Sequence, residues 1–242
     1  MPDKNAEKIR LPILEGRSRL LRAMRRRAIC RWTLARPVLQ SHAKRTLDVC
    51  GACALLLALL LPITLIAVLI KLTDRGPVLF WQDRVGKFGK VFRFPKFRSM
   101  VVNAEALQRQ LDAQNQHGNG VTFKIKRDPR ITWIGRLIRR ASIDELPQLW
   151  CVLKGEMSLV GPRPPLVREV ARYTLADRRR LETVPGLTCF WQVQGRSEIP
   201  FPRQVELDVD YIEKQSLALD VKLLAMTVPA VIGGRGAQEL CF

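Results

Sequence analysis

The sequence predicts an α+β protein in which a membrane-inserted helix hairpin precedes a mostly helical domain with a small β-hairpin. Three observations predict it: an uncharged stretch at 49–70, helical spacing of apolar residues in later segments, and two strand-like runs around paired glycines. The 242 residues are 47% hydrophobic, which excludes wholesale disorder. The net charge of +19 indicates an anionic partner.

The N-terminal region, residues 1–43, is a basic extension. Leu20, Leu21 and Met24 are interleaved with arginines, a pattern typical of an amphipathic helix on an anionic lipid surface. A disordered basic tail is the alternative. The apolar stretch that follows disfavours a nucleic-acid-binding arm, so no nucleic-acid partner is predicted.

Residues 44–76 contain the predicted membrane segment. The uncharged stretch would reach about 33 Å as a helix, enough to cross a bilayer. It is flanked by 13 Lys/Arg against 4 Asp/Glu in residues 1–48, and by 8 against 2 in residues 71–100. Both flanks therefore favour the cytoplasmic side. Pro62 removes a helix hydrogen bond, and a helix that bends there and returns to the same face satisfies both flanks; a straight span is the alternative.

Residues 77–242 are predicted to form the cytoplasmic-face domain. Amphipathic helices in it would suit the membrane interface or the core. The expected elements are a β-hairpin over 77–98 with its turn at Gly86–Gly89, and helices over 104–116, 131–140, 146–153 and 221–232.

Asp144 and Glu145 form the first candidate site, an adjacent carboxylate pair. Pro147 belongs in the first turn of a helix, with Glu145 or Leu146 as its cap, so both carboxylates are expected at a helix N-terminus. The helix dipole and the preceding arginines would favour their ionised forms. An ionised aspartate is a competent nucleophile toward a phosphoryl group, and its neighbour can hold a divalent metal. A capping pair with surface salt bridges is the alternative.

Basic residues elsewhere are candidates for binding phosphate. Arg163 lies between prolines in a rigid Gly-Pro-Arg-Pro-Pro turn, which would pre-position its guanidinium. For Arg163 the alternative is a turn with a purely structural role, and for Lys96 and Arg98 it is solvated surface charge. The other candidates are Lys96 and Arg98 after the hairpin, Arg196 after Gly195, and Asp208 as an acid near the site.

A series of short motifs between Lys44 and about Gly234 resembles one family. Together they resemble the bacterial sugar transferases, specifically the monotopic polyprenyl-phosphate phosphoglycosyl transferases in their minimal catalytic, exopolysaccharide-type form. The motifs are KRTLD (44–48), GPV (76–78), QDRVG (82–86), KFRSM (96–100), DPRIT (128–132), SIDELPQL (142–149), LKGEMSLVGPRP (153–164), PGLT (185–188) and GRS (195–197).

The resemblance implies transfer of a sugar-1-phosphate from a UDP-sugar to a polyprenyl phosphate, with release of UMP. It implies Asp144 as the nucleophile, Glu145 as a ligand of Mg²⁺, and a re-entrant helix broken at Pro62. It places the enzyme at the bacterial inner membrane, against anionic lipid, with its catalytic domain on the cytoplasmic face. Phosphate-binding roles fall on Arg139, Arg163 and Arg196, with Asp208 nearby.

Three residues depart from the family's usual pattern, namely Pro95, Cys151 and Cys189, where Cys189 stands in place of glycine. Two other functions stay open from the residues: a membrane glycosyltransferase that releases UDP, and a non-catalytic scaffold for polysaccharide assembly. The sequence names neither the sugar nor the glycan, and it leaves homo-oligomerisation open.

Overall fold

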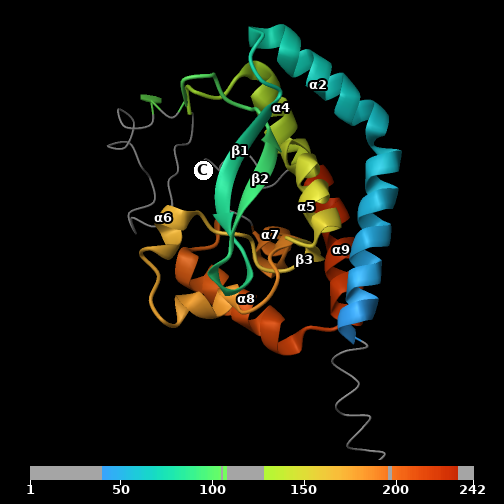
Figure 1. The fold of residues 1–242 in the computed structure, drawn as a ribbon, viewed down its shortest axis with the longest axis vertical. Helices are drawn as coiled ribbons and strands as arrows, with labels where there is room; N and C mark the ends of the chain where they lie inside the picture. The colour runs from blue at the N-terminus through green and yellow to red at the C-terminus, as the bar shows by residue number, and fades with distance from the viewer. Residues whose placement is uncertain (1–39, 105, 108–127, 196–197, 234–242) are drawn as a thin grey trace, which may run out of the picture. The chain divides into compact units, whose positions relative to one another are not determined.

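A computed structural model describes residues 40–104, 106–107, 128–195 and 198–233 (Figure 1). The chain divides into two units, Met1–Lys44 and Arg45–Phe242; the described elements belong to the second, except for the start of the helix that begins at Gln40. The predicted basic helix before residue 40, most of the helix expected at 104–116, and Arg196 lie outside the described residues.

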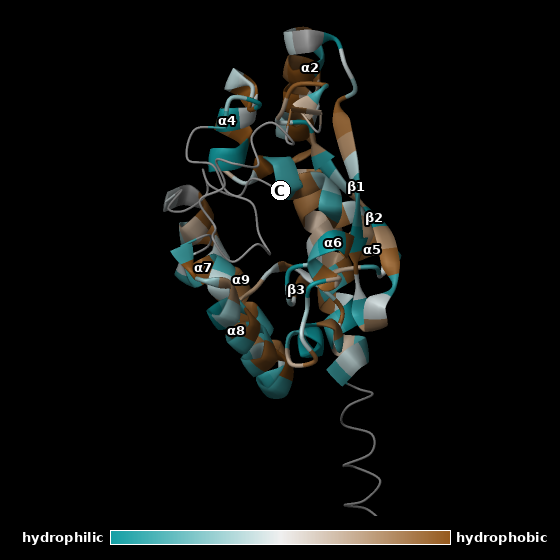
Figure 2. Cartoon of the chain, turned by 90° about the vertical axis from the view of Figure 1, so that its left-hand side faces the viewer, coloured by the Kyte–Doolittle hydropathy of each residue, from teal (hydrophilic) through white to brown (hydrophobic). Residues whose placement is uncertain are grey.

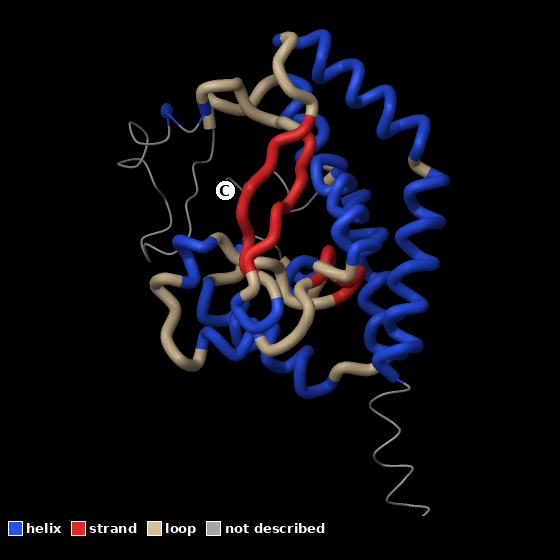
Figure 3. The backbone as a smooth tube through the Cα atoms, viewed as in Figure 1, coloured by secondary structure: helices blue, strands red, loops and turns tan. Residues whose placement is uncertain are grey.

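The described residues contain two small sheets (Figure 3). Strands β1 (Leu79–Val85) and β2 (Val91–Phe97) pair antiparallel around η1 (Lys87–Gly89), which confirms the predicted hairpin. Strands β3 (Ser158–Val160) and β4 (Gly186–Thr188) pair parallel. This second sheet was not predicted, because strands of three residues leave no readable alternation.

Helices make up most of the remaining described structure, in agreement with the predicted mostly helical α+β class. The helices expected over 131–140 and 221–232 correspond to α4 and α9, and the one expected over 146–153 divides into η3 and α5. Their bounds are α4 (Trp133–Arg140), η3 (Ile143–Gln148), α5 (Leu149–Lys154), α6 (Val167–Val170), η4 (Asp177–Leu181), α7 (Phe190–Gln194), α8 (Phe201–Lys214) and α9 (Leu217–Gly233).

The apolar stretch forms a bent pair of helices, Gln40–Ala58 and α2 (Leu60–Asp74), with an angle of 62° between them. The break falls at Leu59, three residues before Pro62, rather than at the proline itself. The reason is that Pro62 has no N–H to donate to the carbonyl of Ala58 and its ring crowds that group. Among the described residues no single helix is long and apolar enough to span a bilayer. The two helices of the bent pair, taken together, have the length and apolar composition of a span.

Helix α2 buries one side and exposes the other. Ile66 and Ile70 pack with Ile134 and Ile138 of α4 in one buried apolar cluster. The opposite side carries large exposed leucines, including Leu61 at 80% exposure. Figure 2 shows the visible part of α2 mostly in the apolar colour, while α8 alternates between polar and apolar.

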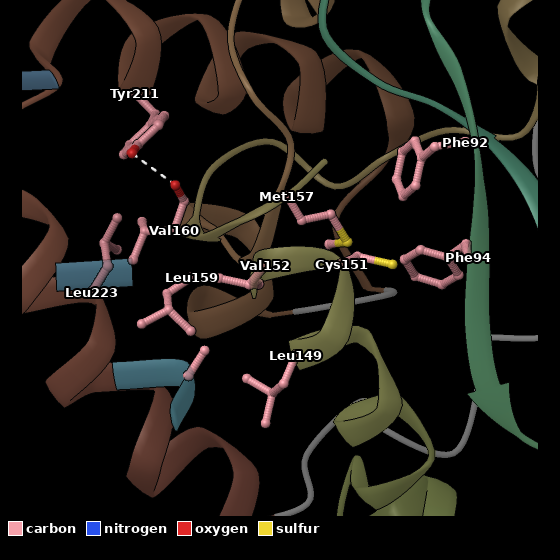
Figure 4. Packing of buried hydrophobic residues seen from close by; sticks show 11 residues of the cluster. Phe92, Phe94, Leu149, Cys151, Val152, Met157, Leu159, Val160, Tyr211 and Leu223 are labelled. Carbon is pink, nitrogen blue, oxygen red and sulfur yellow. Dashed lines mark hydrogen bonds between the residues drawn. The ribbon is translucent and has the colours of Figure 1, made fainter. Parts of the chain in front are cut away.

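The main core lies between β2, α5, β3 and the C-terminal helices. Phe92 and Phe94 of β2 pack against Cys151 and Met157 in this core (Figure 4). On its other side, Tyr211 of α8 donates a hydrogen bond to the carbonyl of Val160 (3.0 Å). The hairpin is thereby fixed against the segment that connects α5 to β3.

The first helix of the bent pair is bound to this core by polar contacts. Arg45 donates to the carbonyls of Val152 (2.5 Å) and Leu153 (2.7 Å) at the end of α5. The buried Asp48 accepts hydrogen bonds from the Ser158 hydroxyl (3.0 Å) and the Leu159 amide (2.9 Å). These bonds join the helix to both α5 and β3.

Candidate active site

The carboxylate pair lies in the first turn of η3, directly after α4. Ser142 precedes it with a left-handed backbone (φ 54°) and makes no side-chain cap. The expected cap at Glu145 or Leu146 is therefore wrong: a 3₁₀ segment begins at Ile143, and the α-helix starts only at Leu149. The tight turn bends the chain sharply, and Asp144 is buried by the packing of β2 on η3.

Glu145 is held by two cations from other elements. Its Oε1 accepts a hydrogen bond from Arg163 Nη2 (2.8 Å) and one from Lys96 Nζ of β2 (3.2 Å). Lys96 Nζ also lies 4.0 Å from Asp144 Oδ2. All four side chains are at most 14% exposed, so the centre contains two carboxylates and two cations in a largely desolvated environment.

The two carboxylates differ in their electrostatics. Burial raises the pKa of Asp144, with a further contribution from Glu145, and Lys96 and Arg139 only partly oppose this. Burial acts in the same sense on Glu145, but Arg163 and Lys96 outweigh it and hold the pKa of Glu145 well below its ordinary value. The expectation that both ionised forms are favoured therefore holds for Glu145 and is wrong for Asp144, because burial dominates there.

Arg163 reaches Glu145 from a loop that follows β3. The loop is pressed against β4, where Gly161 and Gly186 come so close that a Cβ on Gly186 would lie 2.0 Å from the Gly161 amide nitrogen. The Gly161 N–H donates to Thr188 O (2.9 Å) and the Gly186 N–H donates to Pro162 O (2.8 Å). The parallel pair β3–β4 thus fixes the start of the loop that presents Arg163.

The remaining predicted residues fall in different places. Arg139 of α4 is buried, and its charge lowers the pKa of Asp144. The buried Arg98 places its guanidinium against Gly76, just after the bent helices, where a Cβ would lie 2.2 Å from Nη1. Arg196 lies outside the described residues.

Asp208 is fully buried on α8 and forms an ion pair with Arg180 of η4 (2.5 Å). Arg180 also donates to the Tyr173 hydroxyl (3.1 Å). Burial raises the pKa of Asp208 to about 6, against the effect of Arg180. Sequence reasoning singled out Asp208 but missed Arg180, because a basic Arg-Arg-Arg run carries no local sign of which member turns inward.

The residues that depart from the family pattern fit their surroundings. Cys189 has an extended backbone (φ −152°), so the cysteine suffers no strain from a left-handed conformation. The buried Cys151 thiol donates to Arg93 O (3.6 Å). Pro95 lies in β2 opposite Trp81.

The donor set suits a hard divalent cation bound together with a ligand. Over the described ranges no group of three or more His, Cys, Asp or Glu side chains could hold a metal by itself. Mg²⁺, however, is commonly bound by one or two carboxylates together with substrate phosphates. Both contacts of Glu145 go to Oε1, and the Asp144 carboxylate lies beside it with Lys96 Nζ at 4.0 Å from Oδ2. These residues fit such a cation.

A buried carboxylate pair with a lysine and an arginine is a centre suited to binding a phosphate ligand. The chain belongs to the bacterial sugar transferase family, which it matches over residues 39–234. The family predicted from the motifs is confirmed.

Three relatives illustrate the match. The chain is 48% identical over 198 residues to the galactosyl transferase CpsE of Streptococcus agalactiae (81% of this chain, 43% of CpsE). It is 40% identical over 198 residues to the undecaprenyl-phosphate galactose phosphotransferase of Salmonella typhimurium (80% and 41%). It is 36% identical over 198 residues to the exopolysaccharide production protein ExoY of Sinorhizobium fredii (81% and 88%). The chain therefore spans less than half the length of the first two relatives and most of ExoY.

Proposed function

We propose that the chain transfers a sugar-1-phosphate from a UDP-sugar to a membrane polyprenyl phosphate and releases UMP. Support comes from the relatives, one of which is named an undecaprenyl-phosphate galactose phosphotransferase and another a galactosyl transferase. UDP-galactose and undecaprenyl phosphate are therefore the first donor and acceptor to test. The name of ExoY, an exopolysaccharide production protein, supports exopolysaccharide synthesis as the pathway, and we place the reaction at its initiating step.

The unequal roles of the two carboxylates carry the proposal. Glu145 is bound by Arg163 and Lys96, whereas the Asp144 carboxylate accepts no hydrogen bond from the described residues and has Lys96 at 4.0 Å. A nucleophile needs an oxygen that is oriented but not already engaged. Asp144 fits that role, and Glu145 fits a role in holding cations beside it.

The reaction then has two balanced steps. An Asp144 oxygen attacks the phosphorus that bears the sugar, the bond from that phosphorus to the bridging oxygen breaks, and UMP leaves with the bond's electron pair. A phosphate oxygen of the polyprenyl phosphate next attacks the same phosphorus and displaces the Asp144 carboxylate. Lys96 and Arg163 would stabilise negative charge on the transferring phosphoryl group during both steps.

Glu145 is the residue that would hold Mg²⁺, together with the donor phosphates. When bound there, the ion would neutralise charge on the donor phosphates, as metals do in phosphoryl transfer. Its presence would also lower the pKa of Asp144 and so increase the ionised fraction of the nucleophile. Removal of divalent cations with EDTA is expected to abolish transfer, and added Mg²⁺ is expected to restore it.

The bent helix pair would insert into the cytoplasmic leaflet of the inner membrane and return to the same face. The exposed leucines of α2 and the basic residues on both flanks support this placement. Cysteines introduced on the two sides, by Ser41→Cys and Lys87→Cys, should both resist a membrane-impermeant thiol reagent in intact cells. Labelling of either one would contradict a re-entrant arrangement.

The nucleotide product tests the reaction. Purified protein in detergent would be incubated with undecaprenyl phosphate, Mg²⁺ and a panel of UDP-sugars. Release of UMP that is lost in Asp144→Asn, and retained in the matched control Asp83→Asn on the exposed side of β1, is the expected result. Release of UDP would indicate a glycosyltransferase. No nucleotide from any donor would favour the scaffold function.

A further inference from the structure

The loop that carries Arg163 has few backbone N–H groups with which to bond the rest of the protein. Three of its five residues, 161–165, are prolines, which have no N–H to donate. The backbone of these three prolines can therefore be held only through their carbonyls, by donors from other segments. Each proline carbonyl has such a donor: Pro162 O accepts from Gly186 N (2.8 Å), Pro165 O from Val85 N (2.9 Å), and Pro164 O from Arg84 Nη1 (3.0 Å).

Arg84 is the one side chain among these three donors, and it is itself firmly placed. It lies in β1 and is 1% exposed. Gln82 Oε1 accepts hydrogen bonds from Arg84 Nε (3.1 Å) and Arg84 Nη2 (2.8 Å). The guanidinium carbon of Arg84 lies 5.1 Å from the centre of the Phe94 ring. A planar fork bound on two edges and stacked on one face has little freedom to turn.

Burying this guanidinium is costly, which makes a purely passive role unattractive. Burial and, to a smaller extent, the nearby charge of Arg163 lower the pKa of Arg84 to about 9. An apolar side chain would fill the same space without that cost. What an apolar residue could not do is donate to the carbonyl of Pro164, the residue immediately after Arg163.

We infer that Arg84 is a positioning residue, which fixes the Pro164 carbonyl so that the Arg163 guanidinium reaches Glu145 and the donor phosphates. The inference rests on the proposed function for its second part only. A shift of the loop backbone would be carried to the end of the Arg163 side chain, and displacements of about 1 Å can cost about 100-fold in rate. Arg84 thus acts through Arg163 and does not itself touch the reacting atoms.

A double-mutant cycle tests this coupling. We expect Arg84→Met to lower kcat/KM for UMP release about 10- to 100-fold in the wild-type background. In the Arg163→Met background the same change should cost less than about 3-fold, because the group it positions is gone. Arg84→Lys should recover little, since a lysine does not provide the fork. Arg93→Met is the matched control, an exposed arginine of the same hairpin that stacks on Trp81, and it should stay near wild type.

Equal losses in both backgrounds would overturn the inference, because an independent contribution to folding is additive. If Arg84→Met does not fold, Gln82→Ala replaces it in the cycle, since that change removes only the acceptor that orients Arg84. Gln82→Ala should give a smaller loss with the same dependence on Arg163, and a loss independent of Arg163 would again overturn the inference.

Hydrogen exchange provides a readout that does not depend on the reaction. Arg84→Met should speed exchange in peptides containing the amide of Val85, which donates to Pro165 O, and the amide of Leu166, the residue after the proline loop, while Arg93→Met should not. Unchanged exchange would overturn the positioning role even in an active enzyme. If wild type releases no nucleotide but exchange rises as expected, the proposed function fails and the fixing of the loop by Arg84 stands.

Discussion

Arg163→Met is the perturbation that most directly probes the candidate site. The change removes the guanidinium that donates to Glu145 Oε1 at 2.8 Å and keeps an apolar side chain of comparable length in the loop. Lys96 remains 3.2 Å from the same oxygen. Glu145 would therefore lose one of its two cations, and the donor phosphates would lose a preorganised ligand.

The size of the effect follows from burial. Arg163 and Glu145 are 6% and 14% exposed, and removing one partner of a buried ion pair costs about 3–5 kcal/mol. Because Lys96 still contacts Glu145, the expected loss of unfolding free energy lies at the lower end of this range, about 3 kcal/mol. In a domain of this size that loss lowers Tm by about 6–12 °C. Loss of a preorganised charge donor at the transferring phosphoryl group should lower kcat by about 100- to 1,000-fold.

Thermal unfolding in detergent and the release of UMP measure the two effects separately. The double variant Arg163→Met with Glu145→Gln should regain part of the lost stability, because no carboxylate is left underpaired, and it should stay inactive. Arg163→Lys should restore stability better than activity, since lysine restores the charge but not the planar guanidinium fork. A Tm within 2 °C of wild type, or kcat within about 3-fold, would refute the reasoning from burial and charge.

Three further predictions concern other residues. Without acceptor, a donor labelled in its sugar-bearing phosphate should label the wild-type protein covalently and leave Asp144→Asn unlabelled; label on the variant would exclude Asp144 as the nucleophile. The folded pKa of Asp208 is about 6 against 3.8 in the unfolded chain, so the folded state binds more protons between these values. Stability should therefore fall as pH rises through this window, by up to about 3 kcal/mol, and Asp208→Asn should remove this dependence. Gly186→Ala would bring a Cβ to 2.0 Å from the Gly161 nitrogen and should prevent stable folding, whereas Gly233→Ala, which meets nothing within 4 Å, should be neutral in thermal unfolding.

The sequence predicted those features that depend on neighbouring residues. The hairpin followed from two apolar runs around Gly86 and Gly89, and Gly89 indeed adopts the left-handed conformation (φ 84°) that a tight turn requires. The carboxylate pair was recognised from its motif, and the structure places it with Lys96 and Arg163. The roles of these residues stay predictions until the chemistry is measured.

Features that depend on distant residues were not predictable in the same way. Three hydrogen-bonded pairs are far apart in the sequence: Arg163 and Glu145 by 18 positions, Arg180 and Asp208 by 28, and Arg84 and Pro164 by 80. No periodicity in the sequence encodes such pairs, because the topology of the whole domain decides them. The raised pKa of Asp144 was missed for the same reason, since burial by β2 is a tertiary effect.

The bonds from the first bent helix to the core have a practical consequence for any attempt to obtain a soluble fragment. Cutting the chain at residue 77 would remove Asp48, which accepts from both Ser158 and Leu159, and Arg45, which binds the last carbonyls of α5. The strand losing these partners leads directly into the loop of Arg163. Removal of the apolar helices would therefore damage the catalytic face itself, so solubility is better sought by replacing exposed leucines of α2 than by truncation.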